Sequence, residues 1–186
     1  MQTLLVTGYK SHELGIFKEN HEGVYYIKKA LLQRLSSFIE EGLEWVIVSG
    51  QTGVEMWAAE VVISLKEIFP DLKLAVITPF LEQEKSWNEV RQEQYEEILI
   101  NADYVDSVTK RPYENPGQLK AKNIFLVSKT EGMLILFDEE KDGSPKYYLE
   151  AAKQKQEKGD PYEIHFITPY DLDLLVQDEQ ASKYEE

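Results

Sequence analysis

The stretch 45–62, WVIVSGQTGVEMWAAEVV, carries a short apolar run, two glycines and then a longer apolar face at helical spacing. Residues 45–49 have the composition of a buried β-strand, and residues 54–69, which precede Pro70, have the periodicity of an amphipathic helix. A strand that passes through a tight turn into a helix is the repeating unit of a parallel sheet. The stretch therefore predicts an α/β fold.

The same alternation of apolar runs and helical segments continues along the chain. Further strands are predicted over residues 3–7, 73–78, 104–108, 132–137 and 163–168. Further helices are predicted over residues 24–41, 85–101, 117–129 and 146–158, the second with Trp87, Val90, Gln94 and Ile98 on one stripe. The strands are apolar at their centres, as expected when helices cover both faces of a sheet. We predict a Rossmann-like three-layer sandwich with a mostly parallel sheet of about six strands.

Length and composition indicate one cytoplasmic domain. A chain of 186 residues with 42% hydrophobic content can form one core. We expect it over residues 1–176, with the polar, acidic residues 177–186 as a frayed tail. The chain starts with a core-strand pattern, and its apolar runs are far shorter than the about 18–20 residues that cross a bilayer. We therefore expect a cytoplasmic protein with no membrane insertion.

Residue types and charge exclude several kinds of site. The chain has no cysteine, which excludes disulfides, Cys-ligated zinc and thiol catalysis. His12, His21 and His165 show no metal-binding spacing, so we expect no metal site. The net charge of -14 would repel polyanions, so direct nucleic-acid binding is not expected. A small anionic ligand stays compatible, because charges are screened beyond about 10 Å.

Ligands of parallel sheets bind outside the carboxyl ends of the strands, so the loops there are the candidate site. After the second predicted strand come Ser49, Gly50, Gln51, Thr52 and Gly53, with Glu55 in the first helical turn. The glycines would let backbone N–H groups approach a phosphate at the helix N-terminus. In the structural alternative the glycines only turn the chain and Thr52 caps the helix. The position between a core strand and a helix favours a binding loop.

The loops after two other strands are candidates for the same cradle. Gly8, Tyr9 and Lys10 follow the first strand, where Tyr9 could stack on a base and Lys10 could meet a phosphate; an ordinary loop with a solvated lysine is an equal alternative. Gly143 and Ser144 follow the fifth strand, where helix N–H groups and Lys146 could hold a second anion, although Ser144 could simply cap the helix. Weaker candidates on the same rim are Pro79, Phe80, Arg111 and Asn123.

These loops resemble a known family. Residues 7–10 with 13–17, 49–60, 75–80, 111–113 and 143–147 are similar, in matching order over nearly the whole chain, to the bacterial YpsA family. That family belongs to the SLOG superfamily, named for the Smf/DprA and LOG proteins. The resemblance implies a Rossmann-like fold and a nucleotide or nucleotide-derived ligand, such as NAD or an ADP-ribose-like compound. Its first loop matches Ser49, Gly50, Gly53 and Glu55, and its second matches Gly143 and Ser144.

The resemblance also bears on activity and partners. The YpsA family has been linked to cell division and stress responses in Gram-positive bacteria, which implies protein partners and leaves the oligomeric state open. LOG phosphoribohydrolases cleave nucleoside monophosphates with a PGGxGTxxE loop. This chain keeps the spacing from Gly143 to Glu150 but has Lys146 and Tyr147 where that motif has Gly-Thr. Two bulkier residues would crowd the ligand, which disfavours the hydrolase.

Three functions follow, in order of preference. The first is a nucleotide-ligand sensor or regulator, with Gly50, Gly53 and Gly143 shaping the cradle and Glu55 meeting a ribose. The second is a hydrolase of nucleotide glycosidic bonds with Glu55 or Glu150 as the acid–base group. The third is a protein-interaction module without a small ligand.

Overall fold

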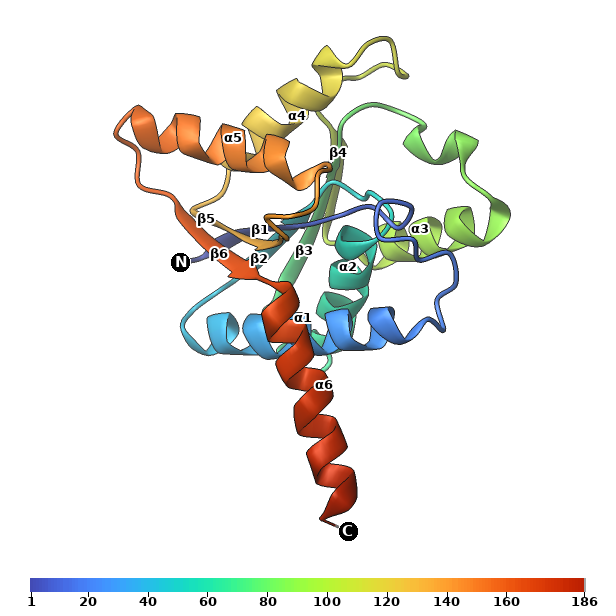
Figure 1. The fold of residues 1–186 in the computed structure, drawn as a ribbon. Coiled ribbons are helices and arrows are strands. Elements are labelled where there is room, and N and C mark those ends of the chain that lie inside the picture. Colours follow the sequence, from blue (N-terminus) through green and yellow to red (C-terminus); the bar gives the residue numbers. More distant parts are fainter. Residues whose placement is uncertain (186) are drawn as a thin grey trace.

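A computed structural model describes residues 1–185 of the chain, and in it six parallel strands form one sheet (Figure 1). The strand order is β4-β3-β2-β1-β5-β6. The strands are β1 (Thr3–Thr7), β2 (Trp45–Val48), β3 (Lys73–Thr78), β4 (Tyr104–Ser107), β5 (Gly132–Leu136) and β6 (Glu163–Ile167). The predicted parallel sheet is confirmed, with every strand within one residue of its expected end.

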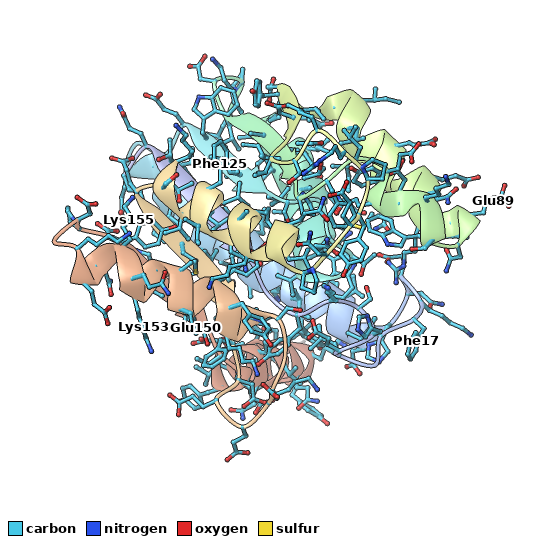
Figure 2. The ribbon with its side chains drawn as sticks, turned by 90° about the horizontal axis from the view of Figure 1, so that it is seen from above. Phe17, Glu89, Phe125, Glu150, Lys153 and Lys155 are labelled. Atoms are coloured by element: carbon cyan, nitrogen blue, oxygen red, sulfur yellow. The ribbon has the colours of Figure 1, made fainter. Side chains whose placement is uncertain are left out.

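Helices cover both faces of the sheet, which confirms the three-layer sandwich. They are α1 (Glu22–Glu40), α2 (Val54–Leu65), α3 (Glu89–Asn101), α4 (Gly117–Ser128), α5 (Pro145–Glu157) and α6 (Pro169–Tyr184), with a short 3-10 turn, η1 (Gln83–Ser86), before α3. Helices α1, α2 and α3 lie on one face, and α6 crosses α1 and extends past it (Figure 1). Helices α4 and α5 lie side by side on the other face (Figure 2). No helix within residues 1–185 has both the length and the apolar character to cross a membrane.

The core follows the two-residue period of the strands. In β1, Leu4 and Val6 pack toward α1 and α2, while Leu5 packs toward α4 and α5. In β2, Val46 and Ile47 divide between the two layers in the same way. Successive side chains of a strand point to opposite faces, so each central strand contributes to both layers. This explains the continuous apolar runs of the sequence.

The strand order positions the ligand crevice. The chain first builds β1, β2, β3 and β4 outward in one direction and then returns to place β5 on the other side of β1. Strand order reverses between β1 and β5, whose register pairs Thr7 with Ile135 at their carboxyl ends. In open α/β sheets ligands bind at this switch point. The crevice therefore lies between the loops that follow β1 and β5.

One predicted helix differs from the structure in its bounds, and two predicted strands differ in their burial. The helix expected over residues 85–101 is interrupted, because Asn88 caps a new helix through a bond from Arg91 N to its Oδ1 at 2.9 Å. The buried residues of α3 are Arg91, Tyr95 and Ile98, while Val90, expected on the apolar stripe, is 66% exposed. Strands β4 and β6 are partly exposed, since each forms an edge of the sheet.

The expectation of a frayed tail over residues 177–186 is wrong for residues 177–184, which continue α6. Glu179 accepts hydrogen bonds from the hydroxyls of Tyr25 and Tyr26 on α1, each at 2.7 Å. These bonds attach α6 to the domain. Residue 186 lies outside the described residues.

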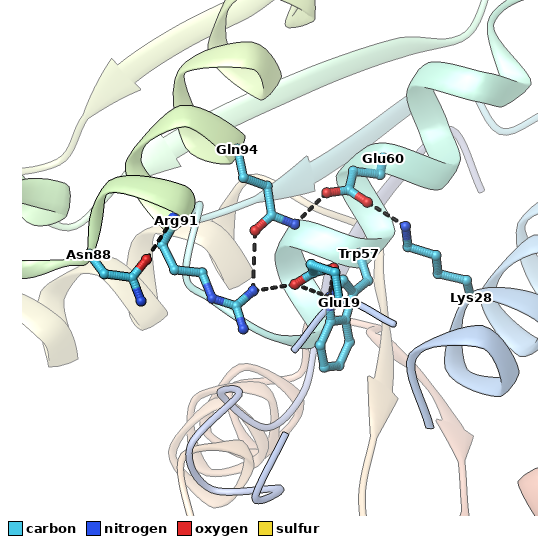
Figure 3. Close-up of polar contacts among 7 residues, drawn as sticks. All are labelled: Glu19, Lys28, Trp57, Glu60, Asn88, Arg91 and Gln94. Atoms are coloured by element: carbon cyan, nitrogen blue, oxygen red, sulfur yellow. Dashed lines mark hydrogen bonds and ion pairs between the residues drawn. The ribbon is translucent and has the colours of Figure 1, made fainter. Parts of the chain in front are cut away.

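A polar network holds the loop after β1 against α2 and α3 (Figure 3). Glu19 of this loop pairs with Arg91 of α3 and accepts a hydrogen bond from Trp57 Nε1 of α2 at 3.1 Å. On the neighbouring turn of α2, Glu60 bonds to Gln94 and to Lys28. The long loop is thereby fixed at its far end, and its first residues are held over the carboxyl ends of the strands.

Candidate ligand site

A buried carboxylate joins three elements at the switch point. Glu55, on the first turn of α2, is 2% exposed. Its Oε1 accepts from Ser49 N at 2.6 Å and Ser49 Oγ at 2.7 Å, and its Oε2 accepts from Thr7 Oγ1 at 2.9 Å and Tyr148 Oη at 3.2 Å. These bonds use the acceptor capacity of a carboxylate. Glu55 therefore fixes the ends of β1 and β2 to α5, and a ribose hydroxyl could bind it only by displacing one of these partners.

Next to this carboxylate lies a buried lysine. Lys122 of α4 is 4% exposed, and its Nζ donates to Tyr148 Oη at 2.5 Å. Burial lowers the pKa of Lys122 to about 8; Glu55 opposes this shift and Lys10 adds to it. Burial also raises the pKa of Tyr148 well above its usual value, and the charge of Glu55 acts in the same direction. Tyr148 is thus a neutral hydroxyl between an acid and an ammonium.

The sequence analysis missed both Lys122 and Tyr148. One signal was present: Lys122 is four residues before Leu126, on the buried face of the predicted helix, where a lysine is unusual. Tyr148 carries no comparable signal, because a buried tyrosine on a helix is ordinary core.

These side chains border a small chamber of about 130 Å³. Its lining residues come from the loops after β1, β2 and β5 and from α2, α4 and α5. They are Gly8, Lys10, Gln51, Glu55, Leu119, Lys122, Asn123, Ser144, Tyr147 and Tyr148. Asn123 is 7% exposed, and its Oδ1 is buried without a hydrogen-bond partner in the described structure. The residues that line the chamber therefore include two lysines and a tyrosine, and the amide oxygen of the lining residue Asn123 is buried without a partner in the described structure.

A larger groove of about 530 Å³ adjoins the chamber between α4 and α5. Leu119, Asn123 and Tyr147 line both hollows. The remaining lining is Pro116, Gly117, Lys120, Ile124, Glu150, Ala151 and Gln154. Glu150 lies on α5, the helix beside α4 seen from above (Figure 2). The two hollows form one site with a polar inner part and a more apolar outer part.

Six of the predicted binding residues line the chamber: Gly8, Lys10, Gln51, Glu55, Asn123 and Ser144. Ser49 lies behind it, bonded to Glu55. Glu150 lines only the groove, so the two candidate acid–base groups occupy different parts of the site.

The glycines serve contacts within the protein. A Cβ on Gly53, which has φ +86°, would lie 2.5 Å from Tyr9 O and 2.6 Å from Ser11 N. A Cβ on Gly50 would lie 2.9 Å from the ring of Tyr95, and one on Gly143 would lie 2.6 Å from the carboxylate of Glu13. Gly53 thus lets the loops after β1 and β2 touch. Gly53, rather than Thr52, occupies the N-cap of α2.

Tyr9 also has a structural role in place of the expected base stacking. Its side chain is buried, and its hydroxyl donates to the carbonyls of Asp138 at 3.0 Å and Lys141 at 2.9 Å, alternatives for one proton, and accepts from Asp138 N at 3.1 Å. It ties the loop after β5 to the loop after β1.

The remaining predicted residues do not line the chamber or the groove. Phe80 follows the buried Pro79 and packs against Tyr113, with ring centroids 5.3 Å apart. Arg111 is 65% exposed and pairs with Glu114 at 3.6 Å. Lys146 pairs with Asp142 at 2.8 Å on the surface of α5.

Comparison with known proteins gives a family and a fold. The YpsA family model, described as the YspA SLOG family, matches residues 4–172. A UPF0398 protein of Bacillus licheniformis is 58% identical over 100% of both chains. The UPF0398 protein YpsA of Bacillus subtilis is 55% identical over 96% of this chain and 99% of its own.

Among solved structures, DNA processing protein A of Helicobacter pylori is similar, with a TM-score of 0.53. At 14% sequence identity the likeness extends to the fold alone. The match covers 88% of this chain but 64% of that protein, which is described as binding single-stranded DNA.

Proposed function

Since the chain belongs to the YpsA SLOG family, we propose that it binds a nucleotide or nucleotide-derived ligand across the chamber and the α4–α5 groove. The observation that carries the proposal is the shared lining of the two hollows at the switch point of the sheet. Lys10 and Lys122 offer positive charge in the chamber, and Leu119, Ile124 and Tyr147 offer apolar surface in the groove. This pairing suits a molecule that joins a phosphate to a ring.

The size of the site agrees with such a ligand. Pockets that hold small molecules measure about 300–1,000 Å³, and the groove of about 530 Å³ lies in that range. The acceptor oxygens of Glu55, the carboxylate that lines the chamber, are occupied within the protein, so this side chain is not free to act as a base. We therefore favour a sensor or regulator over an enzyme.

A thermal-shift panel of nucleotides, dinucleotides, NAD and ADP-ribose tests the proposal. A ligand at 100 times its Kd should stabilise the protein by about 2.7 kcal/mol. Tyr147→Ala, at the junction of the two hollows, should abolish the shift. Tyr170→Ala, the same change at an exposed position on α6, should leave it intact. A panel without any shift would refute ligand binding by these compounds and favour a protein-interaction module.

The second candidate function is hydrolysis of a nucleotide glycosidic bond. It is favoured by Glu150, which lines the groove where the ring of the ligand would lie. Release of free base from nucleoside monophosphates, lost in Glu150→Gln and kept in the neighbouring Lys153→Gln, would establish it. Absence of base release from all the common monophosphates would remove it.

Direct nucleic-acid binding is not part of the proposal, although a protein of similar fold is described as binding single-stranded DNA. The net charge of -14 opposes a polyanion over its whole length. Fluorescence anisotropy with a labelled single-stranded oligonucleotide at low salt should show no binding. Saturable binding would overturn this view.

A further inference from the structure

Lys122 is a buried ammonium group without a counter-ion of its own. Within residues 1–185 its Nζ has one hydrogen-bond partner, Tyr148 Oη, and no carboxylate at ion-pair distance. An ammonium has three N–H donors, so two of them have no protein acceptor. A buried charge in this condition is costly and is retained where something else pairs it.

The carboxylate that lines the chamber with Lys122, Glu55, already accepts hydrogen bonds from other residues. Its oxygens accept from Ser49, Thr7 and Tyr148. The groups that face Lys122 are Glu55 from α2, Lys10 from the loop after β1, and Tyr147 and Tyr148 from α5. The second ammonium increases the demand for an anion.

A separate observation places an unsatisfied group at the same point. Asn123, the next residue along α4, lines both hollows, and its Oδ1 is buried without a partner in the described structure. Buried amide oxygens are normally hydrogen-bonded. The inner end of the site thus lacks both an anion for Lys122 and a donor for Asn123.

We infer that the chamber receives a phosphoryl group of the ligand, with Lys122 as its buried anchor and Lys10 as a second cation. The inference rests on the proposed function and adds the orientation of the ligand. At about 130 Å³ the chamber is smaller than pockets that hold whole ligands, so it takes one small group. The sugar hydroxyls pass Asn123, and the ring lies in the groove against Tyr147. The ligand class is a nucleotide with a terminal phosphoryl group.

Calorimetric titration of AMP, adenosine and inorganic phosphate tests the anchor, with the other three mononucleotide and nucleoside pairs as further probes. Lys122→Met should weaken mononucleotide binding about tenfold or more and leave nucleoside binding unchanged. Lys129→Met, at the end of the same helix and outside both hollows, should change neither affinity. The Lys122→Met protein should remain folded, because the variant removes an unpaired buried charge.

The outcomes separate the two proposals. Mononucleotide affinity that is unchanged in Lys122→Met would refute the anchor and leave the proposed function standing. An equal loss of mononucleotide and nucleoside affinity would show that Lys122 only shapes the site, which also refutes the anchor. Phosphate binding to the wild type that Lys122→Met removes, without binding of any nucleotide, would support the anchor and refute the proposed function for these ligands. No binding of any probe would refute both.

Discussion

Both carboxylate oxygens of Glu13 bond to Ser144, a residue of the loop after β5. Oε2 accepts from Ser144 N and Oε1 accepts from Ser144 Oγ, each at 2.8 Å, while Oε1 also accepts from Lys10 N at 2.8 Å. One side chain thus connects the two loops between which the chamber opens. Glu13 therefore positions Ser144 within the protein.

Glu13→Gln should destabilise the domain by about 1–3 kcal/mol. The NH2 group of the glutamine would replace one carboxylate oxygen, so at least one N–H or O–H group that donates to Glu13 would face a donor instead of an acceptor. Urea unfolding at neutral pH measures the change. Glu139→Gln, an exposed carboxylate on the loop after β5, is the matched control and should cost much less. Equal stabilities of the two variants would contradict a connecting role for Glu13.

The contribution of Glu13 to stability should depend on pH in the acidic range. Burial raises the pKa of Glu13, but the hydrogen bonds from Lys10 and Ser144 outweigh burial and hold the pKa below its usual 4.5. The contribution of a carboxylate with a lowered pKa is present above the unfolded value and is lost as the pH falls through the folded value. The stability difference between wild type and Glu13→Gln should therefore be constant from pH 7 to about 5 and shrink below 4.5. A difference that persists undiminished at the lowest pH that keeps both proteins folded would count against this account.

Lys122 should make the stability depend on pH in the alkaline range as well. Burial lowers its pKa from 10.5 in the unfolded chain to about 8 in the fold, so the unfolded state binds more protons between these values. Stability should rise with pH across this window, relative to Lys122→Met, by about 3 kcal/mol at most. Unfolding curves of both proteins from pH 7 to 10 measure the difference. Parallel profiles would show that the ammonium is not buried in solution.

Gly53→Ala should damage the fold before it affects a ligand. Its added methyl would meet the backbone of Tyr9 and Ser11, and its φ of +86° is unfavourable for alanine. Gly159→Ala is the matched control, since Gly159 has φ +89° with open space around it. We expect Gly53→Ala to cost about 1–3 kcal/mol more than the control, because the loops must separate. Similar melting temperatures for the two variants would mean that the loops adjust without cost.

The strands could be predicted from the sequence because each central strand is buried on both faces and therefore reads as an unbroken apolar run. Helix α6 could not be recognised by that criterion, since Leu175 is its only buried residue among those described. A local signal was nevertheless present: Thr168 and Asp171 form a capping box, with Pro169 at the first helical position. The acidic composition of the segment concealed it.

The loops of the site could be predicted, but the centre of the chamber could not. Gly8, Lys10, Gln51 and Ser144 follow strand ends, and any parallel sheet gathers such loops at one edge. Lys122 and Tyr148 come from the middle of α4 and the first turn of α5. They line the chamber together with Glu55 only because β5 lies beside β1 in the sheet. The periodicity of a single sequence does not determine strand order.

That strand order also has a consequence for biosynthesis. β1 leaves the ribosome before the other strands of the sheet, yet one of its two neighbours, β5, begins only at Gly132. A nascent or prematurely terminated chain that stops before this point leaves the backbone N–H and C=O groups on one side of β1 unpaired, and such edges recruit other strands. Incomplete translation products of this protein should therefore be prone to aggregation and dependent on chaperones until β5 is released.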